Sequence, residues 1–215
     1  MMAVHVGPTG ASQPRAATHH DDAALMARVA GGDERAFAEL YDSHRKRLYR
    51  LAFGVLLDPS EAREAVQEAF LRLHQAAPSW EPRAAVGTWL YRVALNHCLS
   101  LKQRLLRWTR PAPSATASAT ARASESPEKR AALGEAVRIV EQSLAALPMR
   151  QRAVACLFLE GELPPAEIAP LVGMTPNAVR VTLHRALVKL RADLTAAGFD
   201  AVPTPDEALV DLEEN

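Results

Sequence analysis

The sequence predicts an all-α protein, built from two small helical domains that are joined by a flexible linker. Hydrophobic residues make up 48% of the 215-residue chain, but aromatic residues make up only 5%, and alanine is abundant. Alanine is favoured in helices, whereas strands favour β-branched and aromatic residues, so this composition indicates helices. Apolar residues recur at three- and four-residue spacing on both sides of a stretch rich in Pro, Ala, Ser and Thr. That stretch separates the two domains.

The first domain is expected over residues 21–104. Asp21 and Asp22 are expected to cap its first helix, and Gly31 and Gly32 to break the helical pattern. Asp33 then caps a long amphipathic helix. The apolar positions of that helix are Phe37, Leu40, Tyr41, Leu48, Leu51, Ala52 and Val55.

Two more helices complete this bundle. Asp58 and Pro59 begin the first of them, and Pro78 ends it. Its apolar face consists of Ala62, Ala65, Val66, Ala69, Phe70 and Leu73. After the loop SWEPRAAVG, a last helix begins at about Thr88, with Leu90, Val93, Ala94 and Leu101 directed inward.

Three segments carry too few large apolar residues to fold alone. Residues 1–20 are expected to form a disordered N-terminal arm, and residues 105–130 a flexible linker. Residues 195–215 are expected to form a flexible tail, which carries six acidic residues and no basic one.

The second domain, expected over residues 131–194, contains the spacing of a helix-turn-helix. Ala169 is small where two helices must touch, and Gly173 suits a left-handed turn. Thr175 is expected to cap the second helix, with Pro176 at its first position, and Pro170 to leave the preceding helix short or kinked. Burial of Val179, Leu183, Leu187 and Leu190 leaves five side chains facing outward: Asn177, Arg180, Val181, His184 and Arg185.

Charge is unevenly distributed along a chain whose formal net charge is zero. Residues 83–110 include six basic residues and no acidic one, and residues 176–191 include four basic residues and again no acidic one. A single basic helix face is usually only solvated. Two acid-free basic stretches, one in each domain, favour a nucleic-acid partner.

Several other classes of protein are not supported by the sequence. No segment approaches the apolar length of a membrane span, and the N-terminus lacks the apolar core of a signal peptide. Cys98 and Cys156 are expected to be buried and reduced, as in a cytoplasmic protein. His5, His19 and His20 are expected to be solvated rather than to bind metal. We find no phosphate-binding loop and no nucleophile motif, so we expect no metal, no cofactor and no enzymatic activity.

The stretches AREAVQEAFLRLH and TWLYRVALNHCLSLKQR resemble the core-binding and promoter-melting domain of bacterial sigma factors of the extracytoplasmic-function (ECF) group. The resemblance implies that one helix docks on RNA polymerase through Glu64, Gln67, Glu68 and Phe70. Glu64 stands where the family usually has Asp, and Arg63 where a second acid is common.

The same resemblance assigns TWLYRVALN to the helix that reads and opens the promoter minus-10 element. The implied contacts are Trp89, Tyr91, Arg92, Asn96, Lys102 and Arg104. Aromatic and basic residues together suit an opened strand, although Trp89 and Tyr91 are both also candidates for the core. Val86 and Gly87 stand where many relatives carry an aromatic residue and an arginine.

The second domain resembles the sigma domain that binds the minus-35 element, here through Thr175, Asn177, Arg180, Val181, His184 and Arg185. The resemblance implies three partners: core RNA polymerase, promoter DNA and an anti-sigma factor. Two alternatives remain open from the residues. One is a helix-turn-helix regulator that binds an operator without polymerase, and the other is an adaptor whose basic faces bind an acidic protein.

Overall fold

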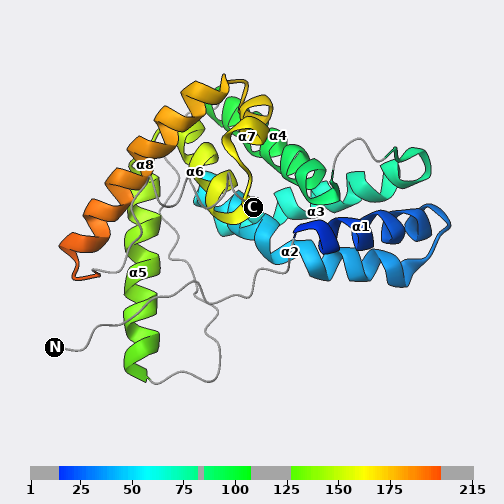
Figure 1. The fold of residues 1–215 in the computed structure, drawn as a ribbon, viewed down its shortest axis with the longest axis horizontal. Helices are drawn as coiled ribbons and strands as arrows, with labels where there is room; N and C mark the ends of the chain where they lie inside the picture. The colour runs from blue at the N-terminus through cyan, green and yellow to red at the C-terminus, as the bar shows by residue number, and fades with distance from the viewer. Residues whose placement is uncertain (1–14, 82–84, 108–126, 200–215) are drawn as a thin grey trace. The chain divides into compact units, whose positions relative to one another are not determined.

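The computed structural model describes the backbone of residues 15–81, 85–107 and 127–199 and the side chains of residues 22–81, 85–101 and 134–199. These residues form eight α-helices and one short 3-10 helix, without strands (Figure 1). The predicted all-α class is therefore confirmed. The helices divide into two compact units, one on each side of the segment between residues 107 and 127.

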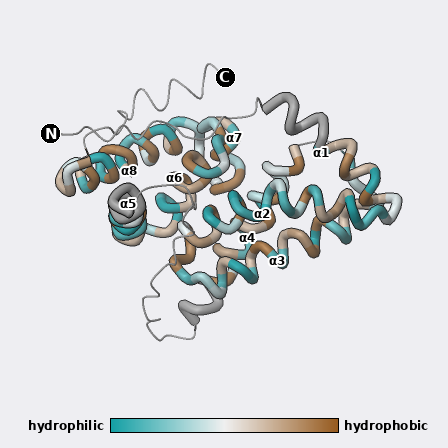
Figure 2. The backbone as a smooth tube through the Cα atoms, turned by 90° about the horizontal axis from the view of Figure 1, so that it is seen from below, coloured by the Kyte–Doolittle hydropathy of each residue, from teal (hydrophilic) through white to brown (hydrophobic). Residues whose placement is uncertain are grey.

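The N-terminal unit packs four α-helices and the 3-10 helix around one core (Figure 1). α2 contacts the three other α-helices of the unit, and along α2 and α3 apolar residues alternate with polar ones (Figure 2). The core includes the fully buried side chains of Leu48, Leu51, Leu73 and Leu90. The elements are α1 (Arg15–Ala30), α2 (Glu34–Leu56), α3 (Pro59–Ala76), η1 (Ala77–Ser79) and α4 (Val86–Arg107).

Aspartate caps fix two of these helix starts. The Asp33 carboxylate accepts the backbone N–H groups of Arg35 and Ala36, at 2.9 and 3.2 Å. The Asp58 carboxylate does the same for Ser60 and Glu61, at 2.8 and 2.9 Å. Both predicted caps are confirmed, and each satisfies N–H groups that have no partner within the helix.

The cap predicted at Asp21 and Asp22 is wrong, because α1 already begins at Arg15 and runs through both residues. Asp22 is instead buried against α2, where its carboxylate lies 2.9 Å from Nε2 of His44. A buried carboxylate requires such a partner. The helical part of residues 1–20 is thus residues 15–20, and residues 1–14 lie outside the described residues.

The C-terminal unit consists of four helices, with α8 in contact with each of the other three. They are α5 (Pro127–Ala145), α6 (Met149–Gly161), α7 (Pro165–Val172) and α8 (Pro176–Ala196). The linker was expected over residues 105–130, but α4 extends to Arg107 and α5 begins at Pro127. The remaining residues of the expected linker, 108–126, lie outside the described residues. Residues 200–215 of the predicted acidic tail also lie outside them.

Cys98 and Cys156 are both buried, as the sequence predicted, and neither forms a disulfide. Burial raises the pKa of the Cys98 thiol to about 12. In the described parts of the chain, no three His, Cys, Asp or Glu side chains are grouped so that they could hold a metal ion. The same residues include no helix that is long and apolar enough to cross a membrane.

A polar contact joins the two longest helices of the C-terminal unit. The hydroxyl of Ser143 on α5, only 4% exposed as a residue, donates a hydrogen bond to the Asp193 carboxylate on α8. Nζ of Lys189 donates to the same carboxylate at 2.8 Å. These two hydrogen bonds, first that of Lys189 and then that of Ser143, hold the pKa of the Asp193 carboxyl below its usual range.

We predict that Asp193→Asn lowers the free energy of unfolding of the C-terminal unit by about 1 kcal/mol at pH 7, because partly exposed charged hydrogen bonds are screened. The folded-state pKa is lowered, so this stabilisation is present above the unfolded pKa and is lost as pH falls through the lower folded value. Urea unfolding at pH 7 and at pH 3 measures the difference in the free energy of unfolding between the unaltered protein and the variant, which is expected to be smaller at pH 3. A difference between the two proteins that is equal at both pH values would contradict the prediction.

Candidate nucleic-acid and polymerase interfaces

The turn between α7 and α8 has the geometry of a helix-turn-helix. Gly173 ends α7 in a left-handed conformation with φ of 66°, and its N–H donates to the carbonyl of Ala169. The hydroxyl of Thr175 caps α8 by accepting the N–H of Ala178 at 3.2 Å. The predicted roles of Gly173 and Thr175 are confirmed, and α7 is short, with eight residues that include Pro170.

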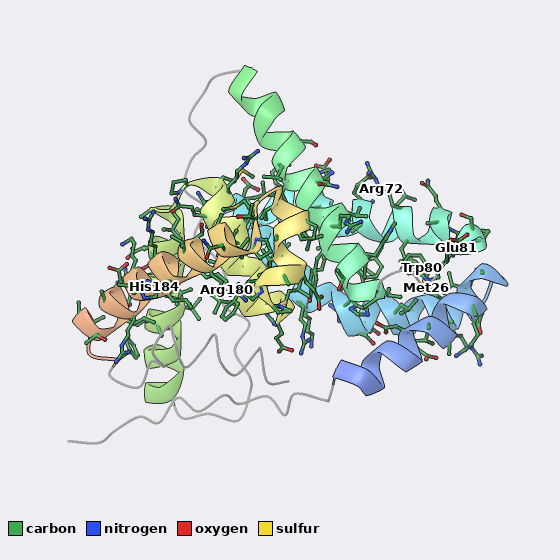
Figure 3. All side chains as sticks on the ribbon, turned by 45° about the horizontal axis from the view of Figure 1, so that its top comes forward. Met26, Arg72, Trp80, Glu81, Arg180 and His184 are labelled. Atoms are coloured by element: carbon green, nitrogen blue, oxygen red, sulfur yellow. The ribbon has the colours of Figure 1, made fainter. Side chains whose placement is uncertain are left out.

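The apolar stripe of α8 fixes which of its side chains are available for binding. Val179, Leu183 and Leu187 are buried, and Leu190 is half-buried. The residues predicted to face outward are all exposed, including Arg180 and His184, which lie one helical turn apart (Figure 3). They are Asn177, Arg180, Val181, His184 and Arg185. This surface combines amide, imidazole, guanidinium and apolar groups that suit the edges of base pairs and the phosphates beside them.

On α4, the structure separates exposed residues from core residues. Arg92 and Asn96 are exposed and four residues apart, so they share one face of the helix. Tyr91 is only 6% exposed and belongs to the core. The predicted contacts Lys102 and Arg104 fall on side chains outside the described residues.

Trp89 lies half-buried at the start of α4, in contact with a second tryptophan. Its ring meets that of Trp80 edge to face, with centroids 5.6 Å apart and planes at 78°. Trp80 was not among the predicted contacts, although an aromatic residue in the loop before α4 was the available signal in the sequence. Trp89 lies about one turn from Arg92 on α4, so an aromatic ring and a cation are close together at this end of the helix.

On α3, the residues that were expected to dock on a partner point in different directions. Glu64 and Gln67 are exposed, and half-buried Glu68 pairs with Arg72 at 2.6 Å. Phe70, at 3% exposed, is a core residue. Its ring packs against Phe37 and Tyr41, with centroids 6.2 and 4.7 Å away.

Leu71 is the exposed apolar residue of α3 that sequence reasoning missed. It is 51% exposed. Its position off the buried stripe of the helix was the available signal, because residues 64, 67 and 71 recur at three- and four-residue spacing and therefore share a face.

The two units match two family models in the same order along the chain. Residues 40–109 match Sigma-70 region 2, and residues 138–190 match Sigma-70 region 4. The chain is 32% identical over 170 residues to the ECF RNA polymerase sigma factor SigM of Mycobacterium tuberculosis, which covers 79% of this chain and 82% of SigM. The chain belongs to the ECF RNA polymerase sigma factors.

Other relatives of this sigma factor include SigW of Bacillus subtilis, which is 27% identical over 174 residues, covering 78% of this chain and 93% of SigW. A solved structure of CnrH in complex with the cytosolic domain of CnrY matches with a TM-score of 0.57 and 26% identity, over 82% of this chain and 98% of that chain. The sigma factor RpoE of Bartonella quintana, solved with the anti-sigma factor NepR, shares the fold. It has a TM-score of 0.62 and 16% identity, over 74% of this chain and 96% of that chain.

Substitutions in α3 test the separation of core and exposed residues in this sigma factor. Phe70→Ala is expected to lower the free energy of unfolding by about 3–5 kcal/mol, because it empties a buried site. Leu71→Ala, next to it, is expected to change stability by less than about 0.5 kcal/mol. Urea unfolding followed by circular dichroism measures both values, and similar losses for the two variants would show that the assignment of these side chains is wrong.

Proposed function

We propose that this chain binds core RNA polymerase and directs transcription initiation to specific promoters, with its two units reading two promoter elements. The carrying observation is that region 2 and region 4 occur in one chain and that the recognition helix of region 4 presents an exposed, acid-free surface. Region 2 occupies the N-terminal part of the chain, where such a regulator would carry an effector or dimerisation domain, so a regulator that works without polymerase is not favoured. The polymerisation chemistry belongs to the polymerase.

For the C-terminal unit, we propose that α8 enters the major groove of the minus-35 element. Arg180, His184 and Arg185 are exposed cationic or polar groups on its outer face. Val181, 44% exposed, offers an apolar surface that suits a thymine methyl group. The Thr175 hydroxyl stabilises the start of the helix by capping it, so we assign Thr175 to positioning as well as to contact with the backbone.

For the N-terminal unit, we propose that α4 holds the opened minus-10 element. Arg92 provides a charge for phosphate, Asn96 an amide for a base edge, and Trp89 an aromatic face for an unstacked base. The core position of Tyr91 supports a role in packing that holds α4 in place. Lys102 and Arg104 remain proposed phosphate contacts.

For polymerase binding, we propose a docking face on α3 made by Glu64, Gln67 and Leu71, with Glu68 at its edge. Exposed apolar surface between polar residues is typical of the centre of a protein interface. Phe70 supports this face from the core side of the helix. We also propose a cytoplasmic location and, from the family, an anti-sigma partner. Isolation of the chain from its host together with polymerase, but without any inhibitor protein, would contradict the anti-sigma partner.

Run-off transcription tests the proposed function directly. Bacterial core polymerase is incubated with genomic fragments from the host, with and without this chain. We expect discrete start sites only in the presence of the chain, and alignment of the DNA upstream of them should reveal two conserved elements. Protection of a duplex site by the chain alone, without any new start sites, would favour the regulator.

Substitution of Arg185 tests the role of α8. Arg185→Gln keeps helix propensity but removes one charge. Loss of a phosphate contact is expected to weaken binding of the holoenzyme to promoters of any sequence and to reduce the slope of log K against log salt by about 0.9. Loss of a base contact is expected to cost about 1–3 kcal/mol and to relax one position of the minus-35 element. Glu160→Gln, on α6, serves as the control, and an Arg185→Gln variant that matches it in affinity and in salt slope would exclude Arg185 from the interface.

A further inference from the structure

A third acid-free stretch in this chain lies in α2, outside the surfaces assigned above. Residues 43–57 contain Arg45, Lys46, Arg47 and Arg50, and no Asp or Glu. The other two such stretches, at residues 83–110 and 176–191, include the proposed DNA-binding helices. The proposed function leaves the stretch in α2 without a role.

Four residues of this stretch form one surface, which we name the basic–aromatic stripe: Lys46, Tyr49, Arg50 and Phe53. Their spacing of three and four residues places them on one face of α2. Lys46 and Arg50 are exposed, whereas Tyr49 and Phe53 are half-buried. The two rings are nearly parallel, with planes at 13° and centroids 6.1 Å apart.

The stripe lies on the side of α2 that faces away from the core. The buried positions of the same part of the helix are Leu48, Leu51, Ala52 and Val55. By helical periodicity, positions 46, 50 and 53 lie roughly opposite positions 48, 51 and 55. Two exposed cations and two half-buried aromatic rings therefore lie together on this side of the helix.

Charge is segregated along α2. Its acidic residues, Glu34, Glu39 and Asp42, all precede the stripe. Arg45 belongs to that acidic side, because its Nε donates to the Asp42 carboxylate at 2.9 Å and its guanidinium lies 5.8 Å from the centre of the Tyr41 ring. Lys46 and Arg50 thus form the positive part of the outer face. In the sequence of α2, no acidic residue follows Asp42.

This combination fits single-stranded DNA better than duplex DNA. Lysine and arginine attract phosphates in either form. An aromatic ring gains its stacking energy only from a base that has left the helical stack, and such stacking tolerates any base. A purely electrostatic surface for an acidic protein would not require the aromatic half of the stripe.

We propose that the basic–aromatic stripe of α2 binds a single strand of DNA, with Lys46 and Arg50 at its phosphates and Tyr49 beneath an unstacked base. This inference rests on the proposed function, in which promoter opening supplies the single strand. It adds α2 to the DNA-binding surface of region 2, beside α4.

Fluorescence anisotropy of the full chain with a labelled mixed-sequence single strand tests the proposal, with salt varied. Lys46→Gln combined with Arg50→Gln is expected to reduce the slope of log K against log salt by about 1.4, because each phosphate contact contributes about 0.7 on a single strand. The matched control is Arg45→Gln, on the same helix but outside the stripe and bonded to Asp42, and it is expected to leave the slope unchanged. Circular dichroism melting verifies that each variant is folded.

The aromatic half of the stripe is tested separately. Tyr49→Leu is expected to weaken single-strand binding about 5- to 150-fold, which corresponds to stacking of about 1–3 kcal/mol per base. Tyr49→Phe keeps the ring and is expected to retain the affinity. Equal losses in these two variants would overturn the stacking role, because they would point to the hydroxyl.

Three outcomes would overturn the proposal. One is an unchanged salt slope in a folded Lys46→Gln/Arg50→Gln variant. Another is an equal loss on duplex DNA of the same sequence, which would remove the preference for a single strand. The third is loss of core polymerase binding with single-strand binding intact, which would make the stripe a protein interface. Run-off transcription by the unaltered chain separates these results from failure of the proposed function, because that activity does not depend on the variants.

Discussion

Burial of one apolar stripe on each amphipathic helix is the constraint on which the binding surfaces depend. A helix that buries Val179, Leu183 and Leu187 has only one rotation about its axis that satisfies all three. The burial of the inner face of α8 therefore determines which side chains its outer face presents. The same holds for α3, where the core position of Phe70 leaves its neighbour Leu71 exposed.

Polar contacts then fix the position of each helix along its axis relative to its neighbours. Apolar packing alone opposes such sliding less strongly. The Asp22 carboxylate pairs with His44 across α1 and α2, and Asp193 accepts hydrogen bonds from Ser143 and Lys189 at the crossing of α5 and α8. A buried or half-buried carboxylate is costly unless its partner is in place, so such contacts penalise a helix that slides. Rotation is thus set mainly by hydrophobic burial, and register mainly by these pairs and by the caps at Asp33 and Asp58.

Those features that depend on local chemistry were predictable from the sequence. The left-handed turn at Gly173, the cap at Thr175 and the exposed face of α8 all follow from neighbouring residues in the chain. Features that depend on contacts between helices were not. Asp22 resembles an N-cap residue in the sequence, but its role is decided by His44, 22 positions away. Tyr91 resembles a DNA contact in the sequence, but the packing of α4 against its neighbours buries it. The pairing of Trp80 with Trp89 is also a tertiary contact, formed across the loop before α4.

A chain with zero net charge gains DNA affinity only where its basic residues are separated from its acidic ones. The number and size of these basic surfaces then determine how tightly the chain binds DNA. Each acid-free surface is small, and a few phosphate contacts give weak, salt-sensitive binding. The chain reaches useful affinity when several such surfaces act together on one DNA molecule, because linked contacts multiply their effect if the geometry allows simultaneous binding. Core polymerase provides that geometry by holding both sigma regions at once. Weak individual surfaces then favour selectivity, since we expect the free chain to bind promoters less tightly than the assembled holoenzyme does.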